Sequence, residues 1–185
     1  MRYFCLTIVL LVLVIAAGTL VSPDPARGAS AAEINRDAGN ALKTLYAKSD
    51  TAKKLGEKAK GILVFPGITK GGFMVGGQYG EGALLSGGKT AGYYSTVQVS
   101  YGLQAGIQKY GYALFFMTDS ALKWIDKSGG FEVGTGPSIV VMDTGAASSL
   151  TTTTGQSEIY AFFFNQKGLM GGLGLQGTKI TKMKK

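Results

Sequence analysis

The stretch from Ala59 to Leu85 constrains the fold most, because short apolar runs alternate in it with glycines and carry almost no charge. Glycine is costly in a helix, whereas in a strand it allows a bend or the close approach of another backbone. The run Ile62–Phe65 has the length of a buried strand, and we expect Pro66 and Gly67 to end it. The stretch therefore predicts a sheet.

The pattern of alternating apolar and polar residues continues along the chain, with glycine-rich turns. Ser86–Lys89 and Lys109–Gly111 are predicted hairpin turns. We expect Gly76 and Gly77 at a bulge or close strand crossing where a β-carbon does not fit. The predicted strands are Gly61–Phe65, Phe73–Tyr79, Ala83–Leu85, Ala91–Gln108, Tyr112–Thr118, Phe131–Met142, Glu158–Asn165, Leu169–Leu175 and Thr178–Thr181.

Two helices are predicted ahead of the strands. In the segment from Ala32 to Ala47, apolar residues recur at three- and four-residue spacing, as on one face of an amphipathic helix. Ser49 or Asp50 is expected to cap a second helix from about Thr51 to Lys60, which Gly61 would end.

A third, short helix interrupts the strands, with Thr118 or Asp119 as its cap, and Thr144 to Ser157 is a polar, Thr-rich connection. Sequential strands with tight turns favour antiparallel pairing. The predicted fold class is therefore α+β: a predominantly antiparallel β sheet folded into a barrel or sandwich, with two N-terminal helices and one short inserted helix packed against it.

The segment Met1–Val21 has one positive charge, an unbroken apolar core and then the Pro-rich Ser22–Pro25, as a secretory signal peptide does. Small-residue cleavage sites lie at Ala29–Ala31 and at Ala26–Gly28, so we expect cleavage near Ala29 to Ala32. An uncleaved membrane anchor is the alternative. We divide the chain into a signal and cleavage region, residues 1–31, and one domain, residues 32–185, exported to the periplasm or the cell surface.

Composition removes several kinds of chemistry. Cys5 is the only cysteine and lies within the signal segment, and the chain has no histidine. The mature protein then lacks thiol chemistry and the commonest general base and metal ligand. The acids are scattered without ligand-like spacing, although folding could pair Glu81 with Asp143. We predict no catalytic residue, no metal and no cofactor.

Two glycine-rich segments resemble nucleotide-binding motifs only superficially. Gly172–Gly177 matches the dinucleotide fingerprint, but too few residues follow it for the required helix and acid. Ala83–Thr90 resembles a phosphate-binding loop, yet a strand is predicted after it where that motif needs a helix. A hairpin turn explains the second segment better.

The charge points to an anionic partner. Without Arg2, Arg27 and Asp24, the 19 basic and 11 acidic residues leave a mature charge of +7. Outside the cytosol, the main anionic partners are lipid headgroups and acidic glycans. Aromatic residues beside basic ones could instead stack on nucleic acid, but we interpret them as core and rim of the sheet, so we do not expect nucleic acid as a partner; they include Tyr93, Tyr94, Tyr101, Tyr110 and Tyr112.

The sequence resembles the SYLF domain family over roughly Ala32 to Ile180. The segments that carry the resemblance are Ala59–Leu85, Gly92–Ser95, Tyr101–Gly106, Phe116–Thr118 ahead of Ala121–Leu122, and Gln166–Met170. The resemblance implies binding of phosphoinositides and other acidic lipids through basic residues of the helical N-terminal region, and actin binding in some yeast members. Within this family, the sequence resembles the small secreted bacterial members.

These observations lead to one main hypothesis, non-enzymatic binding of anionic phospholipid headgroups at a membrane surface. The alternatives are a structural or protein-interaction module of the bacterial cell envelope, with envelope proteins as partners, and a cavity for a hydrophobic small molecule. The second helix is rich in lysine and the chain ends in a basic tail that includes Lys184 and Lys185. The predicted lipid-binding residues are Lys43, Lys53, Lys54, Lys58, Lys60, Lys70, Lys179 and Lys182.

Overall fold

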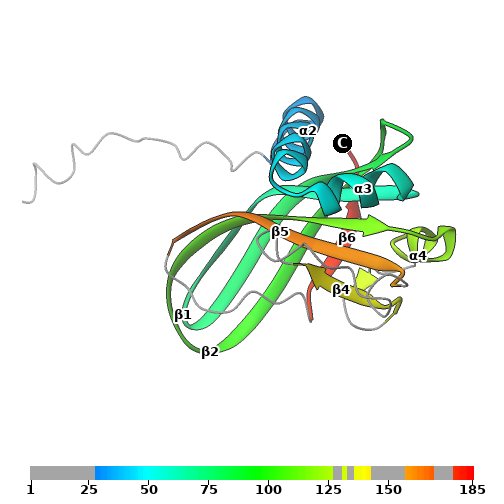
Figure 1. Ribbon diagram of the computed structural model, residues 1–185. Coiled ribbons are helices and arrows are strands. Elements are labelled where there is room, and N and C mark those ends of the chain that lie inside the picture. Colours follow the sequence, from blue (N-terminus) through cyan, green and yellow to red (C-terminus); the bar gives the residue numbers. More distant parts are fainter. Residues whose placement is uncertain (1–27, 127–130, 133–135, 143–156, 169–176) are drawn as a thin grey trace, which may run out of the picture.

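The computed structural model describes residues 28–126, 131–132, 136–142, 157–168 and 177–185 (Figure 1). The fold is α+β, as predicted, with helices packed on a mostly antiparallel sheet. Its helices are α2 (Ala31–Lys48), α3 (Asp50–Lys58) and α4 (Asp119–Trp124). Its strands are β1 (Gly61–Ser86), β2 (Lys89–Phe116), β3 (Phe131–Glu132), β4 (Ile139–Met142), β5 (Ile159–Gly168) and β6 (Lys179–Met183).

The three predicted helices form where their capping residues lie. Ser30 caps α2 in a reciprocal capping box with Glu33, and Thr118 caps α4 by accepting a hydrogen bond from the Ala121 amide. Ser49 ends α2 and also caps α3. Helix α3 ends at Lys58, earlier than predicted, because Gly61 already begins β1.

Strands β1 and β2 form one long hairpin. Its turn is Gly87 and Gly88, both with positive φ (56° and 76°), as a tight two-residue hairpin turn requires. The predicted turn at Ser86–Lys89 is therefore confirmed, and a strand follows it as the sequence indicated. The phosphate-binding interpretation of this segment fails because no helix N-terminus is present there.

Two predicted strand ends are wrong. Pro66 and Gly67 do not end β1, because the β1–β2 register shifts between Phe65 and Ile68 and this irregularity accommodates a residue without an amide hydrogen. Likewise, no turn forms at 109–111. Tyr110 instead continues β2 and is buried in the core, so the pairing partners decide the continuity of these strands.

The hairpin curves back on itself (Figure 1). Near the middle of β1 the register shifts between Phe73 and Val75, and Gly72 is so close to Gly76 that a β-carbon on Gly72 would collide with its backbone. Opposite Gly72, Gly106 has a φ of 137°, a conformation that favours glycine. These glycines allow both strands to bend at the same place.

The bend brings the second half of β1 against its first half, and glycines occupy the contact. A β-carbon on Gly80 would lie 2.7 Å from Ile68 Cγ1 and 3.0 Å from the Gly67 carbonyl oxygen. One on Gly82 would collide with the Val64 carbonyl oxygen and lie 2.7 Å from the Phe65 ring. The sequence thus correctly predicts a close strand crossing in this stretch.

The glycines at that crossing are not the pair predicted from the sequence. Gly76 lies beside the bend and in contact with Gly72, but a β-carbon on Gly77 would meet only the Gln98 carbonyl oxygen, at 3.8 Å. The expectation is therefore wrong for Gly77. Sequence alone does not show which side of a strand meets another backbone.

Strand β2 is the central strand of the sheet. It pairs with β1 along its length, with β6 through its first half and with β5 through its second half. The order is β3-β6-β2-β5-β4, with β1 on the other side of β2, and β4 pairs parallel to β5. This arrangement is sandwich-like and the sheet remains open, so a closed barrel is not the observed form.

Alternation along the strands builds two apolar layers. Odd-numbered Leu63 and Phe65 face the interior of the folded hairpin, together with α4 and Ile180 of β6. Even-numbered Ile62 and Val64 face the opposite side, where α2 and α3 cover the sheet. The helices, the sheet and the returning half of the hairpin thus form successive layers, with a core on each side of the sheet.

The interior of the folded hairpin also contains paired polar side chains. The hydroxyls of Thr96 and Tyr112, both fully buried, are 2.8 Å apart, and burial raises the pKa of Tyr112 well above its ordinary value. Gln78 accepts a hydrogen bond from Tyr110 and lies 3.5 Å from Thr178 Oγ1. The first pair joins the two halves of β2, and the second joins β2 to β1, where water is excluded.

Some predictions lie outside the described residues. They are the strand Leu169–Leu175, the connection Thr144–Ser157 apart from Ser157, and residues 133–135 of the predicted strand Phe131–Met142. The prediction of one continuous strand there is wrong, because only its ends form β3 and β4 and the described residues 136–138 belong to neither.

We expect Gly82→Ala to destabilise the fold by about 1–3 kcal/mol, because the new methyl group meets backbone at the β1 crossing. Gly77→Ala is the matched control, expected to be neutral or stabilising by up to about 1 kcal/mol because its methyl group has room and the unfolded chain loses entropy. Thermal unfolding of both variants measures the difference. Equal melting temperatures would contradict the close crossing.

We expect Thr96→Val to cost about 1–3 kcal/mol, because it leaves the buried Tyr112 hydroxyl without this partner. Thr96→Ser retains the hydroxyl and should retain most of the stability. Urea unfolding at neutral pH compares the two variants. A Val variant as stable as the Ser variant would show that the buried pair contributes nothing.

Candidate functional site

Helix α3 displays lysines because its apolar residues are used for packing. Ala52 and Leu55 are buried against the sheet, and this fixes the outward face of the helix. That face carries Lys53, Lys54, Glu57 and Lys58, all exposed, and exposed Lys60 follows the helix. Of the predicted lipid-binding residues, these four lysines are brought together; we call them the α3 lysine group.

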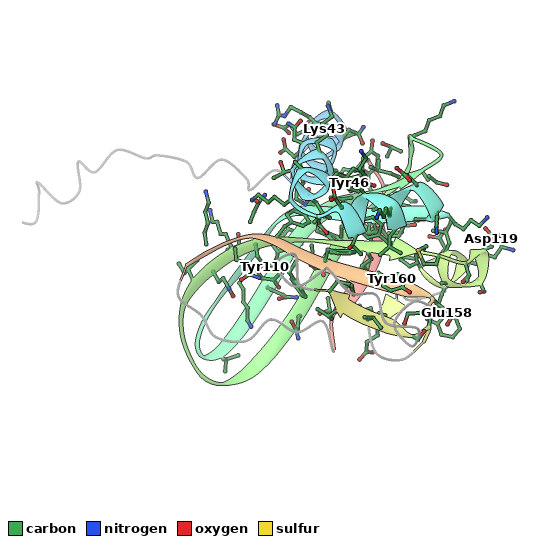
Figure 2. All side chains as sticks on the ribbon, viewed as in Figure 1. Lys43, Tyr46, Tyr110, Asp119, Glu158 and Tyr160 are labelled. Carbon is green, nitrogen blue, oxygen red and sulfur yellow. The ribbon has the colours of Figure 1, made fainter. Side chains whose placement is uncertain are left out.

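Lys43 belongs to the same helical layer. It is exposed on α2, the helix beside α3 on the same face of the sheet (Figure 2). Lys70 is elsewhere, half-buried on β1 shortly before the bend of the hairpin. The structure does not place Lys70 with the α3 lysine group.

Lys179 and Lys182 lie on β6, which pairs with the returning half of the hairpin. Lys182 Nζ is 3.1 Å from both carboxylate oxygens of Asp126, and Tyr94 donates a 2.7 Å hydrogen bond to the same carboxylate. Burial alone would raise the pKa of Asp126, but the hydrogen bonds from Tyr94 and Lys182 and the charge of Lys182 lower it overall. Lys182 thus already has an anionic partner within the fold.

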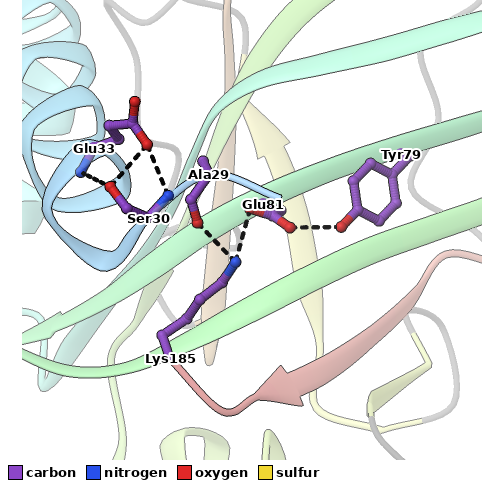
Figure 3. Close-up of polar contacts among 6 residues, drawn as sticks. All are labelled: Ala29, Ser30, Glu33, Tyr79, Glu81 and Lys185. Atoms are coloured by element: carbon purple, nitrogen blue, oxygen red, sulfur yellow. Dashed lines mark hydrogen bonds and ion pairs between the residues drawn. The ribbon is translucent and has the colours of Figure 1, made fainter. Parts of the chain in front are cut away.

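Lys185 is also engaged. Its ammonium donates a 2.7 Å hydrogen bond to the Ala29 carbonyl oxygen and lies 3.3 Å from Glu81 Oε2 (Figure 3). Tyr79 donates to the other oxygen of Glu81 at 2.7 Å. Partial burial, this hydrogen bond and the carboxylate charge raise the pKa of Tyr79 to about 12. We call Ala29, Tyr79, Glu81 and Lys185 the terminal clasp.

A groove of about 950 Å³ runs between α2 and the first half of β1 and reaches the terminal clasp. Two carboxylates, Asp37 and Glu81, lie among its lining residues, which include no Lys or Arg. Each carboxylate is paired with a cation outside the lining, Asp37 with Arg36 and Glu81 with Lys185, so the lining residues offer no cation to an anionic headgroup. The groove therefore does not extend the basic surface of α3.

The described residues contain no group of three His, Cys, Asp or Glu side chains that could hold a metal ion. Glu81 is occupied by Tyr79 and Lys185, whereas Asp143, its predicted partner, lies outside the described residues. The dinucleotide-like glycines also lie outside them, apart from Gly177.

Most of the tyrosines considered for stacking belong to the fold. Tyr94, Tyr110 and Tyr112 are buried, and Tyr93 accepts a 2.9 Å hydrogen bond from Asn35 of α2. These tyrosines are therefore core and rim residues, as the sequence favoured. The structure does not describe the side chain of Tyr101. Nucleic-acid stacking would need these rings on the surface.

Three exposed aliphatic side chains near the bend of the hairpin were not predicted from the sequence. Val75, Val99 and Ile107 are 54%, 59% and 67% exposed. The alternating pattern carries a signal for Val75 and Ile107, because each is next to a buried residue, Gly76 and Gln108. That signal could be read only once the bend was known.

Comparison with family models matches residues 97–185 to the family described as Las17-binding protein actin regulator, the SYLF domain family. The match covers just under half of the chain, and over these residues the chain is similar to the SYLF family. The matched part begins within β2 and includes α4 and β3 to β6, while α2, α3 and β1 precede it. This similarity supports a binding role for the domain.

No curated protein matches the chain. Within the part of the chain that the structure describes, the helices are too short or too polar to cross a bilayer.

Proposed function

We propose that this domain is a non-enzymatic module that binds anionic phospholipid surfaces. One observation carries the proposal: α3 and the residues just after it display four exposed lysines beside two exposed acids, Asp50 and Glu57. The similarity to the SYLF family supports a binding role but does not name this ligand.

The α3 lysine group suits a flat, diffuse negative surface. Its side chains project from one helix, and the packing of Ala52 and Leu55 holds that helix on the sheet. Each lysine near an anionic bilayer contributes about 1 kcal/mol, so four together give useful affinity without a shaped pocket. Lys43 on the neighbouring helix extends the same layer.

We propose the lipid class from its negative charge and not from the shape of its headgroup. Phosphatidylglycerol or cardiolipin would supply the negative charge in a bacterial membrane, and neither requires a specific inositol pocket. We further propose that the domain reaches that membrane by export, because residues 1–28 combine a positive N-terminus, an apolar core and small residues before Ala29.

A second candidate function has its own observation. Val75, Val99 and Ile107 are exposed near one end of the folded hairpin, and clustered exposed apolar side chains mark protein or membrane contacts. A protein-interaction module of the cell envelope would use this end. Binding to envelope proteins without binding to anionic vesicles would favour this second candidate.

Replacing Lys53, Lys54, Lys58 and Lys60 with Gln should lower affinity for phosphatidylglycerol vesicles by on the order of 10³-fold, because about 1 kcal/mol is lost per lysine and each ~1.4 kcal/mol is a factor of ten. Gln is nearly as good a helix former as Lys, so circular dichroism should not change. Vesicle co-sedimentation measures the affinity.

The matched control removes the same total charge elsewhere. It replaces four exposed lysines on other elements, Lys109, Lys123, Lys167 and Lys184, with Gln. This variant should lose much less affinity than the α3 variant. Equal losses would show that net charge alone acts and would contradict the assignment to α3.

Raising the salt concentration from about 0.05 M to about 0.5 M should release most of the bound protein, because the Debye length shrinks from over ~10 Å to about 4 Å. Vesicles of neutral phosphatidylcholine should bind little at either concentration. Salt-insensitive binding, or equal binding to both lipids, would reject the electrostatic proposal.

A further inference from the structure

The terminal clasp encloses the place where the chain would be processed. The backbone of Gly28 lies against the Glu81 carboxylate: a β-carbon at residue 28 would be 2.7 Å from Glu81 Oε1 and 3.2 Å from Lys185 Nζ. The next residue, Ala29, accepts the 2.7 Å hydrogen bond from Lys185 (Figure 3). Both sides of the Gly28–Ala29 peptide bond are thus held beside one carboxylate.

The clasp is well shielded although the peptide bond is accessible. The side chains of Lys185 and Glu81 are only 17% and 11% exposed, whereas Gly28, Ala29 and Ser30 are exposed. A shielded carboxylate strengthens its interaction with nearby cations, because little water screens it. The exposed backbone segment that leads into the clasp is still accessible to a protease.

The contacts at the start of α2 distinguish between the two cleavage sites that the sequence allows. Ser30 accepts from the Glu33 amide, and its own amide donates to Glu33 Oε2 at 2.8 Å. Cleavage after Ala31 would remove this capping box together with the Ala29 carbonyl that Lys185 binds. Cleavage after Gly28 would retain both and would follow the small residues Ala26 and Gly28.

We propose that Gly28–Ala29 is the processing site of the exported chain and that the new α-ammonium group of Ala29 forms an ion pair with Glu81 beside Lys185. A signal peptidase would add one water molecule across this bond. The carboxylate product leaves with residues 1–28, and Ala29 retains the amine, which is protonated at neutral pH. A cation then replaces a neutral amide next to Glu81.

The inference rests on the proposed export and is independent of lipid binding. The other titratable groups around the new terminus are Tyr79, Lys185, and Glu33 and Asp37 of α2, which line the two adjoining pockets. Glu81 would therefore compensate two cations at once. Its loss should weaken the hold on the start of α2.

The first experiment determines the N-terminus. The full chain is exported by a bacterial host, and the purified product is examined by intact mass and N-terminal sequencing. A chain that begins at Ala29 supports the proposal. A chain that begins at Ala32, or one that retains residues 1–28, overturns it, whatever the outcome of the vesicle experiments.

The second experiment tests the ion pair in protein that begins at Ala29, made by removing an N-terminal fusion partner. NMR titration of the Ala29 signals gives the pKa of its α-amino group. Glu81→Gln should lower that pKa by on the order of half a unit or more, because an adjacent anion is lost. Glu57→Gln, the matched control on α3, should leave it unchanged.

Lys185→Gln provides a second, opposite test that does not depend on the folding of the Glu81 variant. Removing a neighbouring cation should raise the pKa of the α-amino group. A pKa unaffected by the Lys185 change, or affected equally by the Glu81 and Glu57 changes, would show that the terminus does not dock in the clasp.

Discussion

The close contact between the two halves of β1 is the constraint on which the rest of the structure depends. Gly80 and Gly82 meet the backbone of residues 64–68, where no β-carbon fits. This contact folds the hairpin over its own interior and encloses Tyr112 and its buried neighbours. With the hairpin folded, β2 can pair with β6 through one half and with β5 through the other.

The helical layer follows from the same sheet. Alternation in β1, β2 and β5 presents a second apolar face, and α2 and α3 cover it. Because Ala52 and Leu55 are used in that packing, the lysines of α3 must face outward. The basic surface proposed to bind lipid is thus a consequence of how the helix is buried.

Charge has different roles in different parts of the chain. Lys182 pairs with Asp126 and Lys185 with Glu81, so these residues contribute to holding β6 and the start of α2 in place. The four lysines of the α3 lysine group outnumber the two exposed acids of α3, Asp50 and Glu57. A basic residue in the sequence is therefore a candidate for binding only after its partners within the fold are known.

Local signals were sufficient for the helices, for the caps at Ser49 and Thr118, and for the Gly87–Gly88 turn, because these depend on residues that are close in sequence. The absence of histidine and the scarcity of cysteine likewise restrict the possible catalytic and metal-binding chemistry before any fold is known. Continuity through Pro66 and Tyr110, the position of the crossing at Gly80 and Gly82, and the separation of Lys70 and Lys182 from α3 were decided only by tertiary structure. Each of these features depends on a backbone segment or a charge that is distant in sequence. The alternation of residues within one strand indicates which side of the strand is buried, but not which element covers it.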